Sequence, residues 1–406
     1  MNKLLSIFDN KIIVMSWKNC NTSTGNAATG RQYFRREYME ELIWSRIKNN
    51  QNVRYRAPRR TGKTSILKYM AKNPVSHHKA IYKDIESIST TSDFYICMIE
   101  LIGALLKSET KIWNGIKDIF GGISIKEIGT KLKVENKGRN YKSVFLDLIN
   151  KIERGNDTYV LFIDEFPDML LKVAESEGES AAKDILDTLR EVRLNEQFDK
   201  NFKLVLTGSV SLLHVVRRIS STKSINDFSE VTLEDMTKEE ALSFIDFITE
   251  GASMESTAET KEYLLSKLQQ YVPYFIQVII EQCDMALHKE GRTQLNNADI
   301  DNAWNHVAKN NATLENWEER LESYFKKDAA FLKKILTICA LDGSIAFTKI
   351  LDLAQNKDYD VSDRWKIMID NILVNDGYLQ ESDHTYTFIS PLLQAWWKHK
   401  FPIKNA

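Results

Sequence analysis

One short stretch, residues 52–69, constrains the fold of this chain more than any other part of the sequence. It reads NVRYRAPRRTGKTSILKY. The run Val53–Arg56 has the β-prone composition of a short strand, and the apolar residues Ile66, Leu67 and Met70 recur at the spacing of one helix face. A strand, a tight loop ending in Gly-Lys-Thr and a helix thus follow one another, which is the local order of a phosphate-binding loop.

The residue types in this loop suit the binding of phosphate groups. Backbone N–H groups of the loop and of the first helical turn point at phosphate oxygens, and the helix dipole adds positive potential. Gly62 lets the backbone approach closely, Lys63 is expected to reach the β- and γ-phosphates, and the Thr64 hydroxyl to bind Mg²⁺. The usual first glycine is replaced by Ala57, whose methyl group still allows a close approach. A chance Gly-Lys-Thr on a basic turn is the alternative, which the flanking strand and helix disfavour. The predicted nucleotide-binding residues of the loop are Ala57, Pro58, Arg59, Arg60, Thr61, Gly62, Lys63, Thr64 and Ser65.

A second motif comes from the near-continuous apolar run Tyr159–Ile163, which is typical of a parallel strand buried on both faces. The run ends in the adjacent carboxylates Asp164 and Glu165. We expect Asp164 to hold Mg²⁺ and Glu165 to orient and activate an attacking water, with Glu165 and Lys63 as the catalytic residues. Following a Gly-Lys-Thr loop, this carboxylate pair indicates nucleotide hydrolysis far more specifically than it does alone.

Another buried strand, Phe202–Leu206, ends at Thr207-Gly208-Ser209. Thr207 and Ser209 are candidate sensors of the γ-phosphate, and a plain turn is the alternative. An arginine from a second subunit is a further candidate part of the site, because such arginines stabilise charge in phosphoryl transfer. The candidates are Arg190, Arg193, Arg217 and Arg218, and for any single one of them a surface or ion-paired role is the favoured reading.

Composition excludes several classes of protein. The chain has 406 residues, is 43% apolar and 27% charged, and carries a net charge of −1, so no global basic excess points to nucleic acid. Its four cysteines lie far apart without a Cys-x-x-Cys pair, which suits a reducing compartment. The apolar run of residues 1–15 is broken by Asp9–Lys11 and lacks a cleavage site, and no run is long enough to span a membrane. We therefore expect a cytoplasmic protein with no membrane contact.

The order of elements predicts an α/β P-loop NTPase core with a parallel sheet, followed by an α-helical lid and a winged helix-turn-helix domain. After Thr237 the β signal disappears, and Thr237 with Glu240 forms a capping box that opens a run of helices. Three helical patterns and two short strands then indicate the winged helix, with Trp396 and Trp397 as core anchors. The predicted domains are 1–50 (N-terminal extension and first helix), 51–235 (ATPase core, with 107–142 as a hairpin insertion), 236–319 (lid) and 320–406 (winged helix).

The chain resembles the archaeal-type ATPases, members of the STAND/AAA-like P-loop superfamily, over nearly its whole length. The matching segments are 33–36, 57–65, 162–166, 208–209, 225–227, 272–277 and 388–393 with 396–397. The double arginine Arg59-Arg60 is characteristic of that family, and Ala57 lies within its pattern. The resemblance implies an ATP-binding core, a helical lid and a winged helix, with nucleotide contacts from Arg36 and Pro273.

These features favour an ATP- and Mg²⁺-dependent ATPase that couples its nucleotide state to a protein partner or to self-association, in signalling, stress or phage defence. The alternative is an ATP-regulated DNA-binding initiator-like or regulatory protein that uses the winged helix. DNA is less favoured, because Arg364 and Lys366 in the expected recognition helix are balanced by Asp363 and Asp370, and the wing is acidic. A non-hydrolysing nucleotide-binding scaffold is a third reading, against which the Asp164-Glu165 pair argues.

Overall fold

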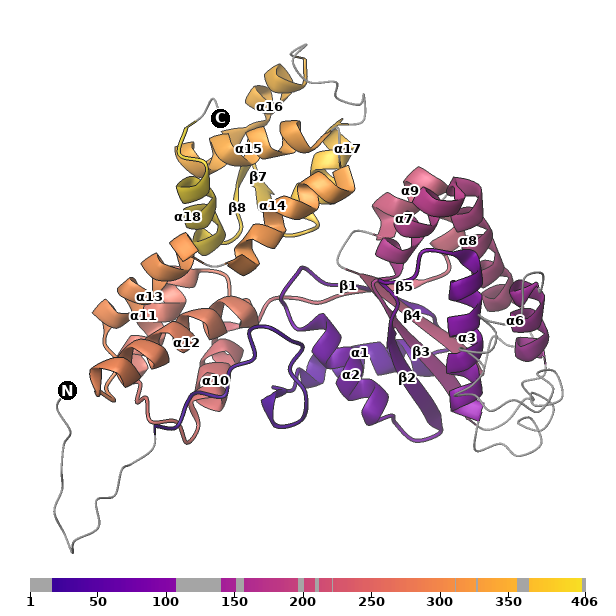
Figure 1. Cartoon of the computed structure of the whole chain (residues 1–406), viewed down its shortest axis with the longest axis horizontal. Coiled ribbons are helices and arrows are strands. Elements are labelled where there is room, and N and C mark those ends of the chain that lie inside the picture. The colour runs from indigo at the N-terminus through magenta and orange to yellow at the C-terminus, as the bar shows by residue number, and fades with distance from the viewer. Residues whose placement is uncertain are drawn as a thin grey trace, which may run out of the picture.

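The computed structural model describes residues 17–106, 140–150, 157–195, 201–208, 212–220, 222–310, 312–325, 328–355 and 365–403. Figure 1 shows them as an α/β core, a helical group beside it, and a C-terminal group above the helical group. Most of the predicted insertion, residues 107–139, lies outside the described residues. Within the described part of the chain, no helix is long and apolar enough to cross a membrane.

The core contains a five-stranded parallel sheet with the strand order β2-β3-β4-β1-β5. Its strands are β1 (Val53–Arg56), β2 (His78–Asp84), β3 (Thr158–Asp164), β4 (Phe202–Gly208) and β5 (Ser229–Thr232). Only β4 separates β1 from β3, so the loop after β1 and the carboxylates after β3 meet at one edge of the sheet. Ligands of open α/β sheets bind at this carboxyl edge. The predicted parallel sheet is confirmed.

Helices cover both faces of the sheet. One face packs against α1 (Glu37–Lys48) and α2 (Lys63–Lys72), and the other against α3 (Thr91–Leu106), α6 (Tyr141–Asn150), α7 (Phe166–Glu177), α8 (Glu179–Leu194) and α9 (Leu212–Ile219). Consecutive residues of β3 alternate between the two cores: Val160 and Phe162 lie in the first, and Leu161 and Ile163 in the second. This double burial explains why the sequence of β3 is apolar throughout.

The helix α7 is absent from the sequence-based prediction. It starts directly after β3, where Glu165 adopts a left-handed backbone conformation (φ 56°) and Pro167 occupies the first turn. Proline is favoured at this position because it has no N–H to leave unpaired. The Phe-Pro pair therefore opens a helix here, and Glu165 lies in the tight turn between the strand and that helix.

The helical group, here called the lid, matches the predicted run of helices. It consists of α10 (Lys238–Thr249), α11 (Ala258–Leu268), α12 (Pro273–Glu290) and α13 (Asn297–Asn310). The predicted capping box is present: Thr237 accepts a hydrogen bond from the Glu240 amide, and the Glu240 carboxylate accepts one from the Thr237 amide. Residues 17–28, here called the strap, cross the lid and are tied to it by Asp284, which accepts hydrogen bonds from Trp17 Nε1 and the Cys20 amide.

The C-terminal group has the element order expected for a winged helix, with additional elements that the sequence analysis does not include. Its elements are α14 (Ala312–Phe325), α15 (Ala329–Asp342), β6 (Ile345–Ala346), α16 (Phe347–Ala354), α17 (Trp365–Ile369), a π-helical turn (Asp370–Val374), β7 (Leu379–Ser382), β8 (Thr385–Phe388) and α18 (Pro391–Lys400). The strands form an antiparallel sheet in the order β6-β8-β7. The additional elements are α14, β6 and α18, and the predicted boundary at 319/320 falls inside α14.

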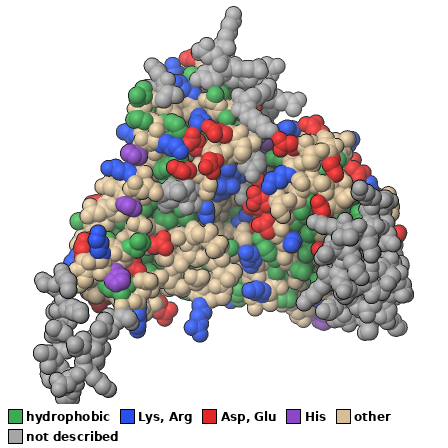
Figure 2. All heavy atoms as spheres, viewed as in Figure 1, with side chains coloured by type: hydrophobic (Ala, Val, Ile, Leu, Met, Phe, Trp, Pro, Cys, Tyr) green, Lys and Arg blue, Asp and Glu red, His purple; other side chains and the backbone are tan. Residues whose placement is uncertain are grey.

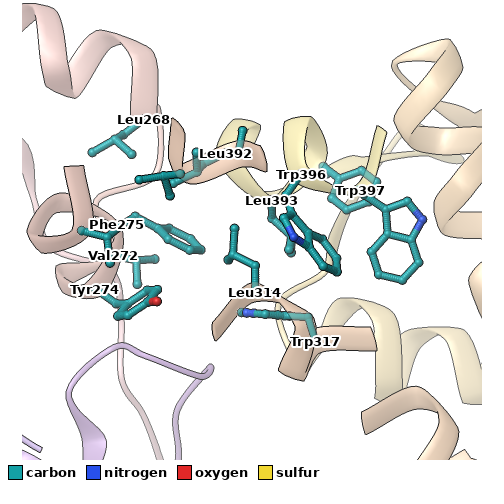
Figure 3. Close-up of a cluster of buried hydrophobic side chains, with 14 of the residues drawn as sticks. Leu268, Val272, Tyr274, Phe275, Leu314, Trp317, Leu392, Leu393, Trp396 and Trp397 are labelled. Carbon is teal, nitrogen blue, oxygen red and sulfur yellow. The ribbon is translucent and has the colours of Figure 1, made fainter. Parts of the chain in front are cut away.

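The lid and the C-terminal group share one hydrophobic core. Figure 3 shows Leu268, Val272 and Phe275 of the lid region beside Leu314 and Leu392 of the C-terminal group. Trp396 and Trp397 are buried in the same core, as the sequence predicts, and Trp397 Nε1 donates to Thr337 Oγ1 at 3.1 Å. The two groups are therefore packed together as one body, while the α/β core has its own two clusters.

Candidate active site

The loop after β1 folds tightly against the start of α2. Gly62 is the residue before α2 and has a left-handed φ of 95°, a conformation that strains any residue with a side chain. Inside the loop, Thr61 Oγ1 donates to the Pro58 carbonyl at 2.7 Å. The first turn of α2 therefore starts immediately after the loop, with its backbone N–H groups at the carboxyl edge of the sheet.

Four polar side chains from this loop and from the end of β3 converge. Lys63 Nζ lies 2.7 Å from Asp164 Oδ1 and 2.9 Å from Glu165 Oε1, and Thr64 Oγ1 donates to Asp164 Oδ2 at 2.7 Å. Burial alone would lower the pKa of Lys63, but the adjacent charges of Asp164 and Glu165 outweigh burial and raise the pKa. Lys63 is therefore held as a cation among carboxylates. Thr64 and Asp164 bring together the oxygen ligands that Mg²⁺ prefers.

The sequence analysis misses a third contact to Asp164. Tyr82 of β2 donates from its hydroxyl to Asp164 Oδ2 at 3.1 Å. The contact follows from the pairing of β2 with β3, which places Tyr82 beside Phe162, and no local motif signals it. Asp84 and Glu86, the other carboxylates near the end of β2, are exposed, and Asp84 Oδ1 accepts a hydrogen bond from the Glu86 amide.

A cavity of about 620 Å³ opens between the loop, the lid, the strap and α14. The predicted residues Ala57 to Ser65, Glu165, Arg36 and Pro273 all line it. Arg36 is buried: its Nη2 donates to the Glu234 carbonyl at 3.1 Å, whereas its Nη1 has no hydrogen-bond partner among the described residues. Asp164 lies behind the lining and is 1% exposed.

One end of the cavity is apolar and aromatic. Phe34 and Phe244 line it and pack edge to face at 5.3 Å, and Pro273, the first residue of α12, also lines the cavity. Gln277, one turn further along α12, also lines the cavity, and its Oε1 accepts a hydrogen bond from the Ser23 amide of the strap at 2.6 Å. The sequence analysis includes Gln277 only as part of the family resemblance and assigns it no role.

The remaining candidates have different environments. Thr207 is 2% exposed, its Oγ1 has no hydrogen-bond partner among the described residues, and it lines a small neighbouring cavity of about 100 Å³. Ser209 lies outside the described residues. Arg193 is an ion-paired residue, because its Nε and Nη2 donate to Asp227 at 2.6 and 2.9 Å, so it is not available to a second subunit. Arg217 and Arg218 are exposed on α9, and Arg190 Nη1 donates to Asn226.

The turn that holds Glu165 requires glycine on the neighbouring strand. A Cβ at Gly208 would lie 2.4 Å from Pro167 Cδ and 3.5 Å from Glu165 Oε2. We therefore expect Gly208→Ala to push Pro167 away and to lower the free energy of unfolding by about 1–3 kcal/mol, the usual cost of overpacking. Thermal or urea unfolding measures this loss. Gly25→Ala is the control, because nothing lies within 4 Å of its added Cβ; equal stability of the two variants would contradict the prediction.

We compared the chain with known families, curated proteins and solved structures. No family profile and no curated protein matches the chain. Among solved structures, it is similar to the Walker-type ATPase PABY2304 of Pyrococcus abyssi, with 16% identity, a TM-score of 0.62, and coverage of 91% of this chain and 97% of that chain. It is also similar to the Aeropyrum pernix ORC2 protein in its ADPNP-ADP complexes, with 13% identity, a TM-score of 0.51, and coverage of 90% and 94%.

At such identities these similarities show the fold alone. The fold is that of the P-loop ATPases, with a parallel sheet covered by helices. More narrowly, the similarity to an archaeal Walker-type ATPase agrees with the sequence resemblance to the archaeal-type ATPases and confirms it at the level of fold.

Proposed function

We propose that this chain binds and hydrolyses ATP and acts as a switch that couples its nucleotide state to a partner protein. The observation that carries the proposal is the cluster of Lys63, Thr64, Asp164 and Glu165, which is joined by contacts of 2.7–2.9 Å. Lys63, Thr64 and Glu165 line a cavity of about 620 Å³, a size typical of sites for small organic ligands. A cation, a hydroxyl and two carboxylates at a helix N-terminus suit phosphoryl transfer to water.

The two ends of the cavity suit the two ends of ATP. The triphosphate would lie on the backbone N–H groups of the loop, near Lys63 and Arg36. The base would lie against the apolar end, between Phe34 and Pro273. There the amide of Gln277 is oriented by the strap: because its Oε1 accepts from the Ser23 amide, its Nε2 is the end left to donate to a ring nitrogen.

Lys63 and Glu165 would act in sequence as the phosphates bind. Lys63 is paired with two carboxylates in this structure, so it would exchange part of this pairing for phosphate oxygens. The exchange frees a carboxylate oxygen of Glu165 to accept a proton from the attacking water. Closure of the lid and the strap over the cavity excludes other water, which strengthens these electrostatic contacts.

The oxygen atoms of Thr64 and Asp164 suit the binding of Mg²⁺. Thr64 Oγ1 and Asp164 Oδ2 are hard oxygen ligands 2.7 Å apart, and Tyr82 orients the same carboxylate. Thr64 and Asp164 would hold the ion, Asp164 through water. When bound, the ion neutralises charge that develops on the phosphate oxygens.

We favour a protein partner, or a second copy of the chain, over DNA as the target of the switch. On the face shown in Figure 2, acidic and basic side chains are interspersed. The β7–β8 hairpin, which is the expected wing, carries the exposed carboxylates Glu381 and Asp383, and Lys366 of α17 lies over the Phe347 ring. Such a surface attracts a polyanion poorly, because phosphate contacts supply most non-specific affinity for DNA.

Two measurements on the full chain test this function. We expect saturable binding of ATP with Mg²⁺, followed by phosphate release. We also expect no sub-micromolar binding to duplex DNA at physiological salt, with or without ATP. Absence of ATP binding contradicts the proposal as a whole, whereas tight duplex binding that weakens steeply as salt rises favours the DNA-binding alternative.

A further inference from the structure

The helix α14 presents a polar face to the nucleotide cavity. The α14 residues that line the cavity are Asn316, Glu319, Arg320 and Ser323. They are spaced by three, one and three residues, which places them on one side of the helix. The other side is apolar: Trp317 packs edge to face on Tyr378 at 4.9 Å, as a member of the shared core that Figure 3 shows. Core packing therefore fixes which face of α14 meets the cavity.

Arg320 is the cation on this face, and it is 5% exposed. Its charge and that of Arg59 both act on the buried Tyr378 hydroxyl, which donates to the Trp317 carbonyl at 2.7 Å. Arg59 belongs to the phosphate-binding loop. Arg320 and Arg59 thus both line the cavity and both lie within electrostatic range of this one hydroxyl.

Two further contacts place the C-terminal group directly on the loop. Arg56 Nη1 donates to Asn375 Oδ1 at 2.9 Å. A Cβ built on Gly377 would lie 3.3 Å from Pro58 Cβ, so the turn after the π-helical segment touches the loop itself. The wall that carries Arg320 is thus adjacent to the groups that bind phosphate.

The charge of the cavity favours a polyanion. Its lining contains more cationic side chains than carboxylates. The cations are Arg36, Arg59, Arg60, Lys63 and Arg320, and the carboxylates are Glu165 and Glu319. Arg320 already contacts neighbouring protein groups, so a ligand would have to compete for its guanidinium. Phosphate is suited to do so, because its oxygens accept two parallel hydrogen bonds from one guanidinium.

We propose that Arg320 contacts the phosphates of the bound nucleotide and thereby makes the C-terminal group part of the nucleotide site. This inference rests on the proposed function, because it assumes that the cavity takes ATP. The arginine comes from the same chain and from a third group of elements, unlike the second-subunit arginines considered from the sequence. Nucleotide then bridges the core, the lid and the C-terminal group.

Calorimetric titration of the full chain with ATP and with inorganic tripolyphosphate, each with Mg²⁺, tests the proposal. We expect Arg320→Gln to weaken both ligands by the same factor, about ten- to a hundred-fold, the usual loss for a charged hydrogen bond. Arg320→Lys keeps the charge without the planar fork, and we expect a smaller loss. Arg31→Gln is the matched control, because Arg31 is exposed and does not line the cavity, and its affinities should equal those of the wild type.

The outcomes are distinguishable from each other and from failure of the proposed function. Wild-type affinity of Arg320→Gln for both ligands overturns the phosphate contact, and so does a loss for ATP with none for tripolyphosphate. If Arg320→Gln does not fold, Arg320→Lys decides alone: a loss of three-fold or more for both ligands supports the contact, and a smaller or unequal change overturns it. If the wild-type chain binds neither ligand, the proposed function itself fails.

Discussion

Replacing Lys63 with alanine should abolish tight ATP binding. The ammonium group of Lys63 is the cation that lies between Asp164 and Glu165, at 2.7 and 2.9 Å. Its removal deletes the contact to phosphate and leaves two adjacent carboxylates, whose negative charge repels an incoming triphosphate. Truncating one partner of a buried, hydrogen-bonded charge pair between two binding partners costs about 2–5 kcal/mol of binding free energy, so we expect about a hundred-fold weaker binding or more.

Isothermal titration with ATP and Mg²⁺ measures this loss, and circular dichroism establishes that the variant is folded. Lys72→Ala is the matched control, because Lys72 is an exposed lysine in the last turn of the same helix. Wild-type affinity in a folded Lys63→Ala chain would show that the nucleotide binds elsewhere.

The second large effect is on turnover. Glu165→Gln should leave ATP bound but reduce phosphate release by about a hundred-fold or more, the range attributed to a general base. Glutamine keeps the size of the side chain and still accepts a hydrogen bond from Lys63 through its Oε1, but its amide does not take a proton from water. The left-handed turn at residue 165 is retained, because the backbone is unchanged.

Single-turnover phosphate release, measured beside the ATP affinity, separates the two effects. Glu86→Gln serves as the control, because Glu86 is an exposed carboxylate beyond the end of β2 that does not line the cavity. A Glu165→Gln chain that releases phosphate at the wild-type rate would place the base on another residue.

Local patterns predict the parts of the site that are contiguous in sequence. The Gly-Lys-Thr loop and the strand that ends in Asp164-Glu165 are each defined by a few neighbouring residues, and the structure brings both to one edge of the sheet. The observed limits of β3 and β4 agree closely with the predicted ones, because both strands are buried on both faces and their sequences are therefore largely apolar. The lid helices also agree with the prediction, because α10 opens with a capping box and α12 with a proline in its first turn.

The groups that the sequence analysis misses act through contacts between distant parts of the chain. Tyr82 reaches Asp164 only because β2 pairs with β3, and Gln277 is oriented by an amide 254 residues earlier. Arg320 comes to the cavity because the apolar side of α14 packs into the core shared with the lid. Helical spacing predicts that such a helix has a polar face, but it does not tell what that face meets.

The single core shared by the lid and the C-terminal group restricts how this molecule can change shape. The lid and the C-terminal group cannot slide past each other without cost, because sliding would expose the packed apolar side chains of both groups. Movement of this body against the α/β core would bend the chain between β5 and α10, residues 233–237, and would disturb the Arg56–Asn375 hydrogen bond and the packing of Gly377 against Pro58. We therefore expect the lid and the C-terminal group to move as one rigid body relative to the α/β core.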